Sequence, residues 1–274
     1  MITKYINYLR NIKGYSENTC LAYEKDIRQF AKWMQAHRSD ARWSNITRED
    51  IDDFITQLAE RGIKAASSNR KLSAISGLYS FFKREGMETD NPCRFESRRK
   101  IAQTIPNTIK PEELQVAYNH SFGIAKVMIG ILAGTGIRIQ ELLDLTWESI
   151  DFSENSLRIR GKGAKERLVY TTAESLDTLR QVKQHNDVSG LIFTIDQRQA
   201  RYLIWEALKP YCDASQLSPH AIRHTFATNL AKEGVNVSTI GSILGHNQLT
   251  TTQKYIDSCQ LQGREICQQY AILN

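Results

Sequence analysis

The chain has 274 residues and a hydrophobic content of 41%, which is enough for two domains of ordinary size with buried cores. Its longest apolar run, residues 127–133, is far too short to cross a bilayer, and its first residues lack the apolar core of an export signal. The net charge of +6 comes entirely from residues 1–107, which hold 19 Lys and Arg against 13 Asp and Glu, and such a basic region favours a nucleic-acid partner.

Four amphipathic helices are predicted in the first part of the chain. Apolar residues recur at helical spacing over residues 2–9, 23–34, 51–58 and 72–82. Ser16 is a suitable N-cap for the second helix, a capping box begins at Thr47 before the third, and Gly86 ends the fourth. Four such helices in about 90 residues predict a small helical bundle over residues 1–92.

The pattern then stops at residues 93–107, which contain proline, carry several basic side chains and show no clean periodicity. We interpret this segment as an interdomain linker, either a solvated loop or a basic strap along a phosphate backbone. The residues expected to contact a nucleic-acid backbone are Arg70, Lys71, Arg94, Arg98, Arg99, Lys100 and, further along the chain, Lys165.

Residues 108–274 form the second predicted domain, which is mainly helical with a small sheet. Pro111 suits a first helical position, and a buried helix over residues 124–133 is expected to close at Gly134. Alternation of apolar and charged residues around a glycine-rich turn predicts a β-hairpin over residues 157–170. Further helices are expected within residues 134–145 and at 173–186, 198–209, 218–234, 238–244 and 250–257, and a tail begins near 261.

Three of the six histidines lie between residues 218 and 256, beside an arginine and a tyrosine: His220, Arg223, His224, His246 and Tyr255. His220, Arg223 and His224 share one helix face because they are three and four residues apart. A zinc site is disfavoured, since alanine replaces the glutamate of an H-E-x-x-H motif and an arginine repels a cation. An ordinary packed helix and a site for phosphoryl transfer remain open.

Phosphoryl transfer without a metal needs cationic groups, because charge grows on the non-bridging phosphate oxygens. A planar guanidinium suits this role, and a second one is offered by Arg138 at a predicted helix start, with Glu141 three residues later. A proton donor for the leaving oxygen is offered by Lys162 in the hairpin turn, and Tyr255 offers a nucleophilic hydroxyl.

The segments that carry these residues are TGIRIQELLDL, IRGKGAKERLV, SPHAIRHTFATNL and LGHNQLTTTQKY, and in this order they resemble the catalytic domain of the tyrosine site-specific recombinases, the integrase family. The first part, with YSENTCLAYEKDIRQFAKW and NRKLSAISGLYSFFKREGMETDNP, resembles the core-binding domain of compact Xer-like members. The resemblance implies a four-helix SAM-like domain followed by an α/β catalytic domain.

The resemblance also implies a role for each residue of the site. Arg138 and Arg223 would clamp the scissile phosphate, with Glu141 orienting the clamp. Lys162 would protonate the leaving 5′-oxygen, with Lys165 as its rival. The remaining catalytic residues would be His220 for proton transfer, His246 as a hydrogen-bond donor to the phosphate, and Tyr255 as the nucleophile. His224 is not in the family's catalytic set and keeps a structural interpretation. Gln140 and the Ile256-Asp257 pair depart from common family residues without removing a catalytic group.

The implied activity is strand exchange on double-stranded DNA carrying a specific site, through a 3′-phosphotyrosyl intermediate and a Holliday junction, with no metal, ATP or other cofactor. Four protomers would act together, as a homotetramer or with a second recombinase. A catalytically silent DNA-binding architectural protein and a type IB topoisomerase-like enzyme are the alternatives. The five scattered cysteines lack a C-x-x-C pair, which indicates reduced thiols and a cytoplasmic protein. We expect no membrane partner, because the longest apolar run is too short to cross a bilayer.

Overall fold

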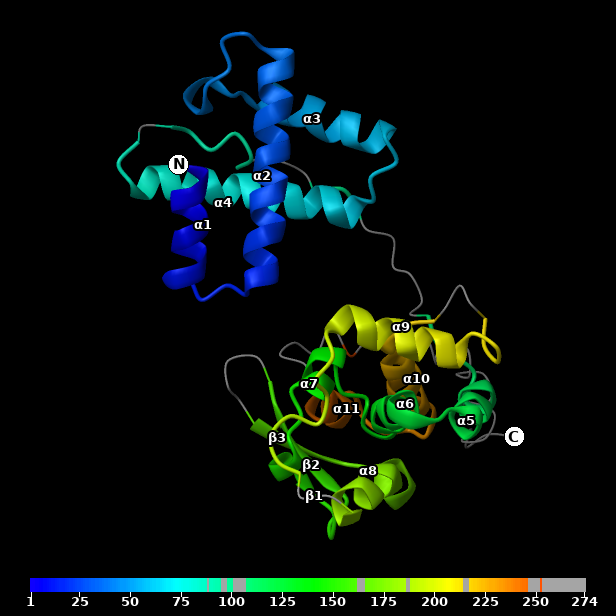
Figure 1. The fold of residues 1–274 in the computed structure, drawn as a ribbon. Coiled ribbons are helices and arrows are strands. Elements are labelled where there is room, and N and C mark those ends of the chain that lie inside the picture. The colour runs from blue at the N-terminus through cyan, green and yellow to red at the C-terminus, as the bar shows by residue number, and fades with distance from the viewer. Residues whose placement is uncertain are drawn as a thin grey trace, which may run out of the picture. The chain divides into compact units, whose positions relative to one another are not determined.

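The computed structural model describes residues 1–87, 89–94, 98–100, 107–161, 166–185, 188–213, 217–245 and 252 (Figure 1). The chain divides into two compact units, Met1–Gln103 and Thr104–Asn274, and the division falls within the segment that we interpret as a linker. No helix in these described stretches is long and apolar enough to cross a membrane.

The first unit consists of the four expected helices and one short additional turn. Its helices are α1 (Ile2–Asn11), α2 (Glu17–His37), α3 (Arg48–Glu60) and α4 (Ala65–Arg84), with a 3-10 turn η1 (Trp43–Asn45) between α2 and α3. Both predicted N-caps are present: the Ser16 side chain accepts from the Thr19 N–H, and Thr47 forms a reciprocal capping box with Asp50.

An aromatic core holds these four helices together. Phe30, Phe54, Tyr79 and Phe82 are all almost fully buried, and the rings of Phe30 and Phe54 meet edge to face with centroids 5.0 Å apart. The Tyr79 hydroxyl donates to the Trp43 carbonyl at 2.8 Å, so the one polar atom that this tyrosine carries into the core is satisfied.

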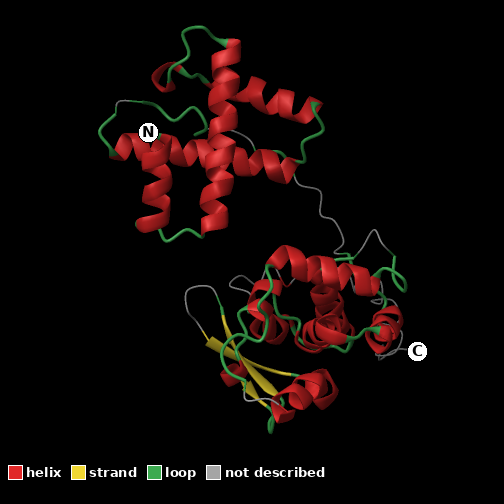
Figure 2. Ribbon diagram, viewed as in Figure 1, coloured by secondary structure: helices red, strands yellow, loops and turns green. Residues whose placement is uncertain are grey.

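The described residues of the second unit form a small sheet and eight helical segments, one of which is a buried central helix, as expected for a mainly helical domain (Figure 2). Its elements are α5 (Pro111–His120), α6 (Gly123–Thr135), α7 (Ile139–Leu143), η2 (Trp147–Ser149), β1 (Ile150–Asp151), β2 (Ser156–Arg160), β3 (Glu166–Tyr170), α8 (Ala173–His185), α9 (Gln197–Leu208), α10 (Pro219–Lys232) and α11 (Val237–Leu244). Helix α6 contacts α5, α7, α8, α9, α10 and β3, and its middle residues are buried on all sides. The sheet is antiparallel in the order β1-β2-β3, with Leu157 opposite Val169.

The end of α6 differs from the expectation. The helix continues through Gly134 to Thr135 and ends at Gly136, which has the left-handed backbone (φ 63°) of a helix C-cap. Gly134 has a packing role instead, because a Cβ there would lie 2.2 Å from the Thr171 hydroxyl oxygen. The predicted helix over 250–257 and the tail from 261 lie outside the described residues, apart from Thr252.

Two of the residues predicted to contact a DNA backbone are instead engaged within the first unit. The ammonium of Lys71 lies 2.6 Å from Asp26 Oδ1 and 2.8 Å from Gln29 Oε1, and the lysine is only 7% exposed. The prediction was wrong for Lys71 because its side chain points into the core. The Arg99 guanidinium donates to the Ile63 carbonyl at 2.9 Å, and its backbone N–H donates to Asn69 Oδ1 at 3.0 Å, which fixes its segment to α4.

The other described candidates remain accessible. The Arg70 side chain is 41% exposed although it contacts Asp26, and Arg94, Arg98 and Lys100 are exposed. These four side chains place positive charge on the surface of the first unit, whereas Lys71 stabilises the helical bundle.

Replacing Lys71 with methionine removes the buried partner of Asp26 while keeping a similar volume. We expect the free energy of unfolding of this unit to fall by about 3 kcal/mol, because a buried carboxylate would keep only its contact with Arg70. Urea denaturation measures the change, with the exposed Lys83→Met as the matched control, expected to change stability by less than about 0.5 kcal/mol. Equal effects of the two substitutions would contradict a stabilising ion pair.

Candidate active site

The carboxyl end of helix α11 accepts hydrogen bonds from arginines that lie far away in the sequence. Arg223 on α10 is 3% exposed, and its guanidinium donates to the Gly136 carbonyl at 2.7 Å and to the Leu244 carbonyl at 2.9 Å. Carbonyl oxygens at a helix C-terminus carry partial negative charge, so a buried cation is stabilised there. Arg223 thereby ties the end of α6 to the end of α11.

Arg138 reaches the same carbonyl groups from the start of α7. Its Nη2 donates to the Gly245 carbonyl at 3.0 Å, and its Nη1 lies 3.5 Å from the Leu244 oxygen that Arg223 also contacts. The structure therefore brings together the two arginines that the sequence analysis selected. The Arg138 side chain is 39% exposed, so this guanidinium can meet an anion from solvent.

Glu141 lies beneath Arg138 and is 7% exposed. Its carboxylate accepts from the Arg138 backbone N–H at 2.9 Å, which caps α7, and from Arg138 Nη1 at 2.9 Å. The orienting role suggested by the resemblance thus has a geometric counterpart, because one carboxylate fixes both the backbone and the side chain of Arg138.

A third arginine, which the sequence analysis missed, completes this group. Arg167 on β3 donates from Nη1 and Nη2 to the two Glu141 oxygens at 3.0 and 2.9 Å, and from Nε to the Ile243 carbonyl at 3.1 Å. The alternation of β3 contained a signal, since Arg167 lies two residues before the buried Val169 and so on the inward face. We call Arg138, Glu141, Arg167 and Arg223 the arginine cluster.

The arginine cluster keeps a positive charge around an ionised carboxylate. Burial alone would raise the pKa of Glu141, but hydrogen bonds from Arg167 and from the Arg138 backbone, together with their positive charges, hold that pKa below its ordinary value. The guanidinium groups of Arg138 and Arg167 bind this carboxylate, and that of Arg223 shares the Leu244 carbonyl with Arg138, so the four side chains carry a net charge of +2. This excess leaves the exposed side of the arginine cluster positively charged.

The two described histidines of the predicted site lie one turn apart on α10. The ring centroids of His220 and His224 are 6.2 Å apart. His220 reaches solvent, yet partial burial lowers its pKa, and the positive charges of Arg223, Arg201 and Arg138 lower it further. His220 is therefore neutral at pH 7 and can accept a proton, whereas His224 is half-buried.

The remaining predicted site residues, Lys162, Lys165, His246 and Tyr255, lie outside the described residues. The described chain fixes the sequence neighbours of three of them. Strands β2 and β3, paired at Arg160 and Glu166, flank the segment that contains the two lysines, and Gly245 ends α11 just before His246. Within the described stretches, no group of three or more His, Cys, Asp or Glu side chains is placed to hold a metal ion.

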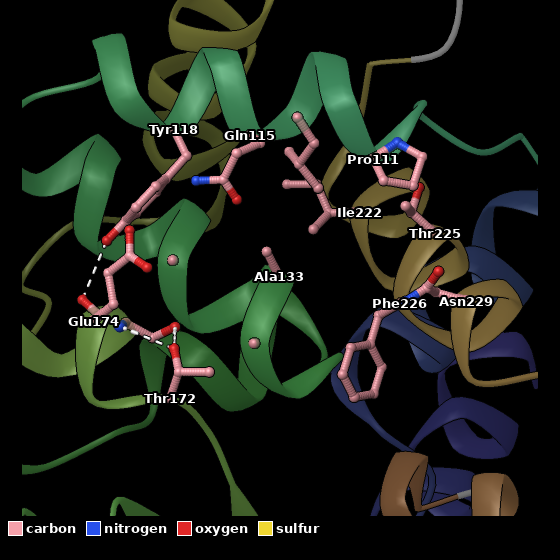
Figure 3. Close-up of a pocket in the computed structure, with 14 residues that line it drawn as sticks. Pro111, Gln115, Tyr118, Ala133, Thr172, Glu174, Ile222, Thr225, Phe226 and Asn229 are labelled. Carbon is pink, nitrogen blue, oxygen red and sulfur yellow. Dashed lines mark hydrogen bonds between the residues drawn. The ribbon is translucent and has the colours of Figure 1, made fainter. Parts of the chain in front are cut away.

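A separate pocket of about 320 Å³ lies where α5, α6 and α10 meet (Figure 3). Pro111, Tyr118, Ala133, Ile222 and Phe226 are among its lining residues, and the Tyr118 hydroxyl donates to the Glu174 carbonyl at 3.2 Å. No member of the arginine cluster lines this pocket, so this pocket is separate from the charged site.

Replacing Glu141 with glutamine should change how stability depends on pH. The lowered pKa means that the carboxylate stabilises the fold above its ordinary pKa of 4.5, and that this contribution is lost as pH falls through the lower folded-state value. At pH 7 we expect Glu141→Gln to cost about 3 kcal/mol, with the difference from the unsubstituted protein shrinking toward pH 3. Thermal denaturation between pH 3 and pH 7 measures this difference in stability, with the exposed Glu112→Gln as control. A difference that does not shrink toward pH 3 would contradict the lowered pKa of Glu141.

Comparison with known proteins assigns both parts of the chain. Residues 108–261 match the model of the phage integrase family, and residues 2–86 match the phage integrase N-terminal SAM-like domain. The tyrosine recombinase XerD of Yersinia pestis is 29% identical over 98% of this chain and 96% of its own length. The tyrosine recombinase XerD of Haemophilus influenzae is 30% identical, covering 93% and 92% of the two chains.

Solved structures show the same fold at lower identity. The XerH site-specific recombinase in a post-cleavage complex with a palindromic difH substrate is 18% identical, with a TM-score of 0.75 over 97% of this chain and 84% of the other. The Tn1549 transposon integrase in complex with transposon right-end DNA is also 18% identical, with a TM-score of 0.71 over 97% and 99%. The predicted fold class and family resemblance are thereby confirmed, and this chain belongs to the phage integrase family, among relatives that are Xer tyrosine recombinases.

Proposed function

We propose that this chain is a site-specific DNA recombinase that cleaves and rejoins DNA strands through a 3′-phosphotyrosyl intermediate. The observation that carries the proposal is the meeting of Arg138 and Arg223 at the carboxyl end of α11, in a member of the phage integrase family. A phosphodiester is the anion that this reaction places between two guanidinium groups.

Each catalytic residue then has one chemical task. The Tyr255 oxygen attacks phosphorus and forms a tyrosyl–phosphate bond, while the bond from phosphorus to the 5′-oxygen breaks. Lys162 gives that oxygen a proton, and neutral His220 accepts the proton of the tyrosine. Arg138, Arg223 and His246 stabilise the charge on the non-bridging oxygens. Attack by a 5′-hydroxyl of a partner duplex reverses these steps and joins the exchanged strands.

The DNA partner follows from the surfaces as well as from the neighbours. XerH is seen with difH, the Tn1549 integrase with transposon-end DNA, and a lambda integrase dimer with a COC′ core site. In this chain Arg70, Arg94, Arg98 and Lys100 present positive charge for phosphate contacts from the core-binding domain, residues 1–92, and the linker, residues 93–107. Binding should weaken steeply with salt.

The last part of the proposal concerns the number of protomers, the compartment and the biological task. Four protomers, identical or paired with a second recombinase, would act on two sites in the cytoplasm, with the tail from about residue 261 docked on a neighbouring protomer. The task would be resolution of chromosome dimers, or integration and excision of a mobile element. A silent DNA-binding architectural protein or a type IB topoisomerase-like enzyme would give different outcomes in the test below.

The direct test is a covalent adduct on DNA. The protein is incubated with nicked duplexes prepared from sheared genomic DNA of the source organism, so that the cleaved fragment diffuses away and the adduct accumulates. We expect an SDS-resistant complex at one sequence, abolished by Tyr255→Phe because that side chain has no nucleophilic oxygen. The exposed Tyr170→Phe is the matched control and should retain the adduct.

Two outcomes would contradict the proposal. Binding without any adduct would identify an architectural protein. An adduct at scattered sequences, together with relaxation of supercoiled DNA and no exchange between two duplexes, would identify a topoisomerase-like activity.

A further inference from the structure

Arg167 is the member of the arginine cluster that binds Glu141 through both terminal nitrogens of its guanidinium. Its side chain is 16% exposed, its two terminal nitrogens are bonded to Glu141, and its Nε is bonded to the Ile243 carbonyl. An arginine held on three sides by internal acceptors is poorly placed to bind DNA. Its contacts instead join β3, α7 and α11, which carry or adjoin three of the proposed catalytic residues, Lys162, Arg138 and His246.

We propose that Arg167 is a positioning residue that sets both the charge and the direction of the Arg138 guanidinium for the scissile phosphate. This inference rests on the proposed function, since it names how that same site is held ready. Arg167 binds the Glu141 carboxylate with a fork of two hydrogen bonds, one from each terminal nitrogen to each oxygen. Arg138 Nη1 donates to Oε1 alone, the oxygen that Arg167 Nη1 also binds.

The first consequence concerns charge. Without Arg167, the Glu141 carboxylate would be balanced by Arg138 alone, and the net charge of the arginine cluster would fall from +2 to +1. A neighbouring carboxylate that is already neutralised lets Arg138 act on an approaching phosphate with its full charge. In a partly buried site such a charge acts more strongly than it would in water.

The second consequence concerns direction. The Arg167 fork fixes the plane of the Glu141 carboxylate, and that plane decides where Arg138 Nη1 can bond. Gly245 fits the same arrangement, because a Cβ at that position would lie 2.8 to 3.1 Å from atoms of the Arg167 guanidinium. The carbonyl of Gly245 is in turn the acceptor for Arg138 Nη2, so one glycine accommodates both arginines.

The test separates positioning from simple support of the fold. The substrate is a nicked duplex that carries the sequence found in the SDS-resistant complex. Arg167→Met should bind this duplex with an affinity within about 3-fold of the unsubstituted protein, yet cleave it about 100-fold more slowly at saturating protein. Adding Glu141→Gln to Arg167→Met returns the net charge to +2 and should recover at least about 5-fold in cleavage rate. The control for a general loss of packing is Arg180→Met. It removes an arginine of the same unit that is bonded to Phe152, Asn155 and Asp177, and it should cleave DNA normally below its melting temperature.

The proposal is overturned if Arg167→Met cleaves within about 3-fold of the unsubstituted protein, or if the double variant is no faster than Arg167→Met. Should Arg167→Met not fold, Arg167→Lys carries the test: it keeps the charge without the fork, and it must reduce cleavage more than DNA binding. Equal losses in the two measurements would also overturn the proposal. If the unsubstituted protein forms no adduct, the proposed function fails, which is a distinct result.

Discussion

The carbonyl groups at the end of α11 and the carboxylate of Glu141 accept hydrogen bonds from three arginines that enter from three separate parts of the chain. Like charges gathered this closely repel each other, and they are held together only because each guanidinium has an oxygen acceptor with negative or partly negative charge. The position of α10, α7 and β3 around α11 therefore depends on this set of bonds. The same set leaves a positive excess that a phosphate can meet.

Glycines at two helix ends allow backbone carbonyl groups to come close to the guanidinium groups of the arginine cluster. Helix α6 ends at Gly136, whose carbonyl accepts from Arg223, and a Cβ on this glycine would lie 2.4 Å from the Phe226 ring. Helix α11 ends at Gly245 in the same left-handed conformation, so its last carbonyls are open to side-chain donors. Two glycine C-caps thus turn the ends of two helices toward the charged site, while the rest of the domain core packs around α6.

Much of this architecture could be predicted from sequence because it follows from local rules. Caps at Ser16 and Thr47 and apolar stripes defined the helices of the first unit, and alternation defined the hairpin. The meeting of Arg138 and Arg223, 85 positions apart, depends on packing at long range. The chemistry of phosphoryl transfer and the family resemblance both selected this pair, but no local pattern showed that the two residues meet. Local spacing also could not show that α6 continues past Gly134, since the contact with Thr171 comes from another element.

Charged side chains on buried faces were the main source of error. Lys71 lies four residues before Ile75 and seven before Leu78, which is the buried stripe of α4, yet its charge suggested an exposed contact for DNA. Its partner Asp26, which is fully buried, comes from α2, and the pairing of the two residues was not visible in either helix alone. Arg167 was overlooked for the same reason, because its acceptors belong to α7 and α11.

The central claim is that the arginine cluster binds and stabilises one scissile phosphate. The most direct measurement compares cleavage of two nicked duplexes, one ordinary and one with a methyl group replacing a non-bridging oxygen of the scissile phosphate, which removes its charge. On the ordinary duplex, Arg138→Met should cleave at least about 100-fold more slowly than the unsubstituted protein. On the uncharged duplex the two proteins should cleave within about 10-fold of each other, since little charge remains to be stabilised. An equal loss on both duplexes would contradict the claim and would show that Arg138 supports the fold of the site without acting on the phosphate.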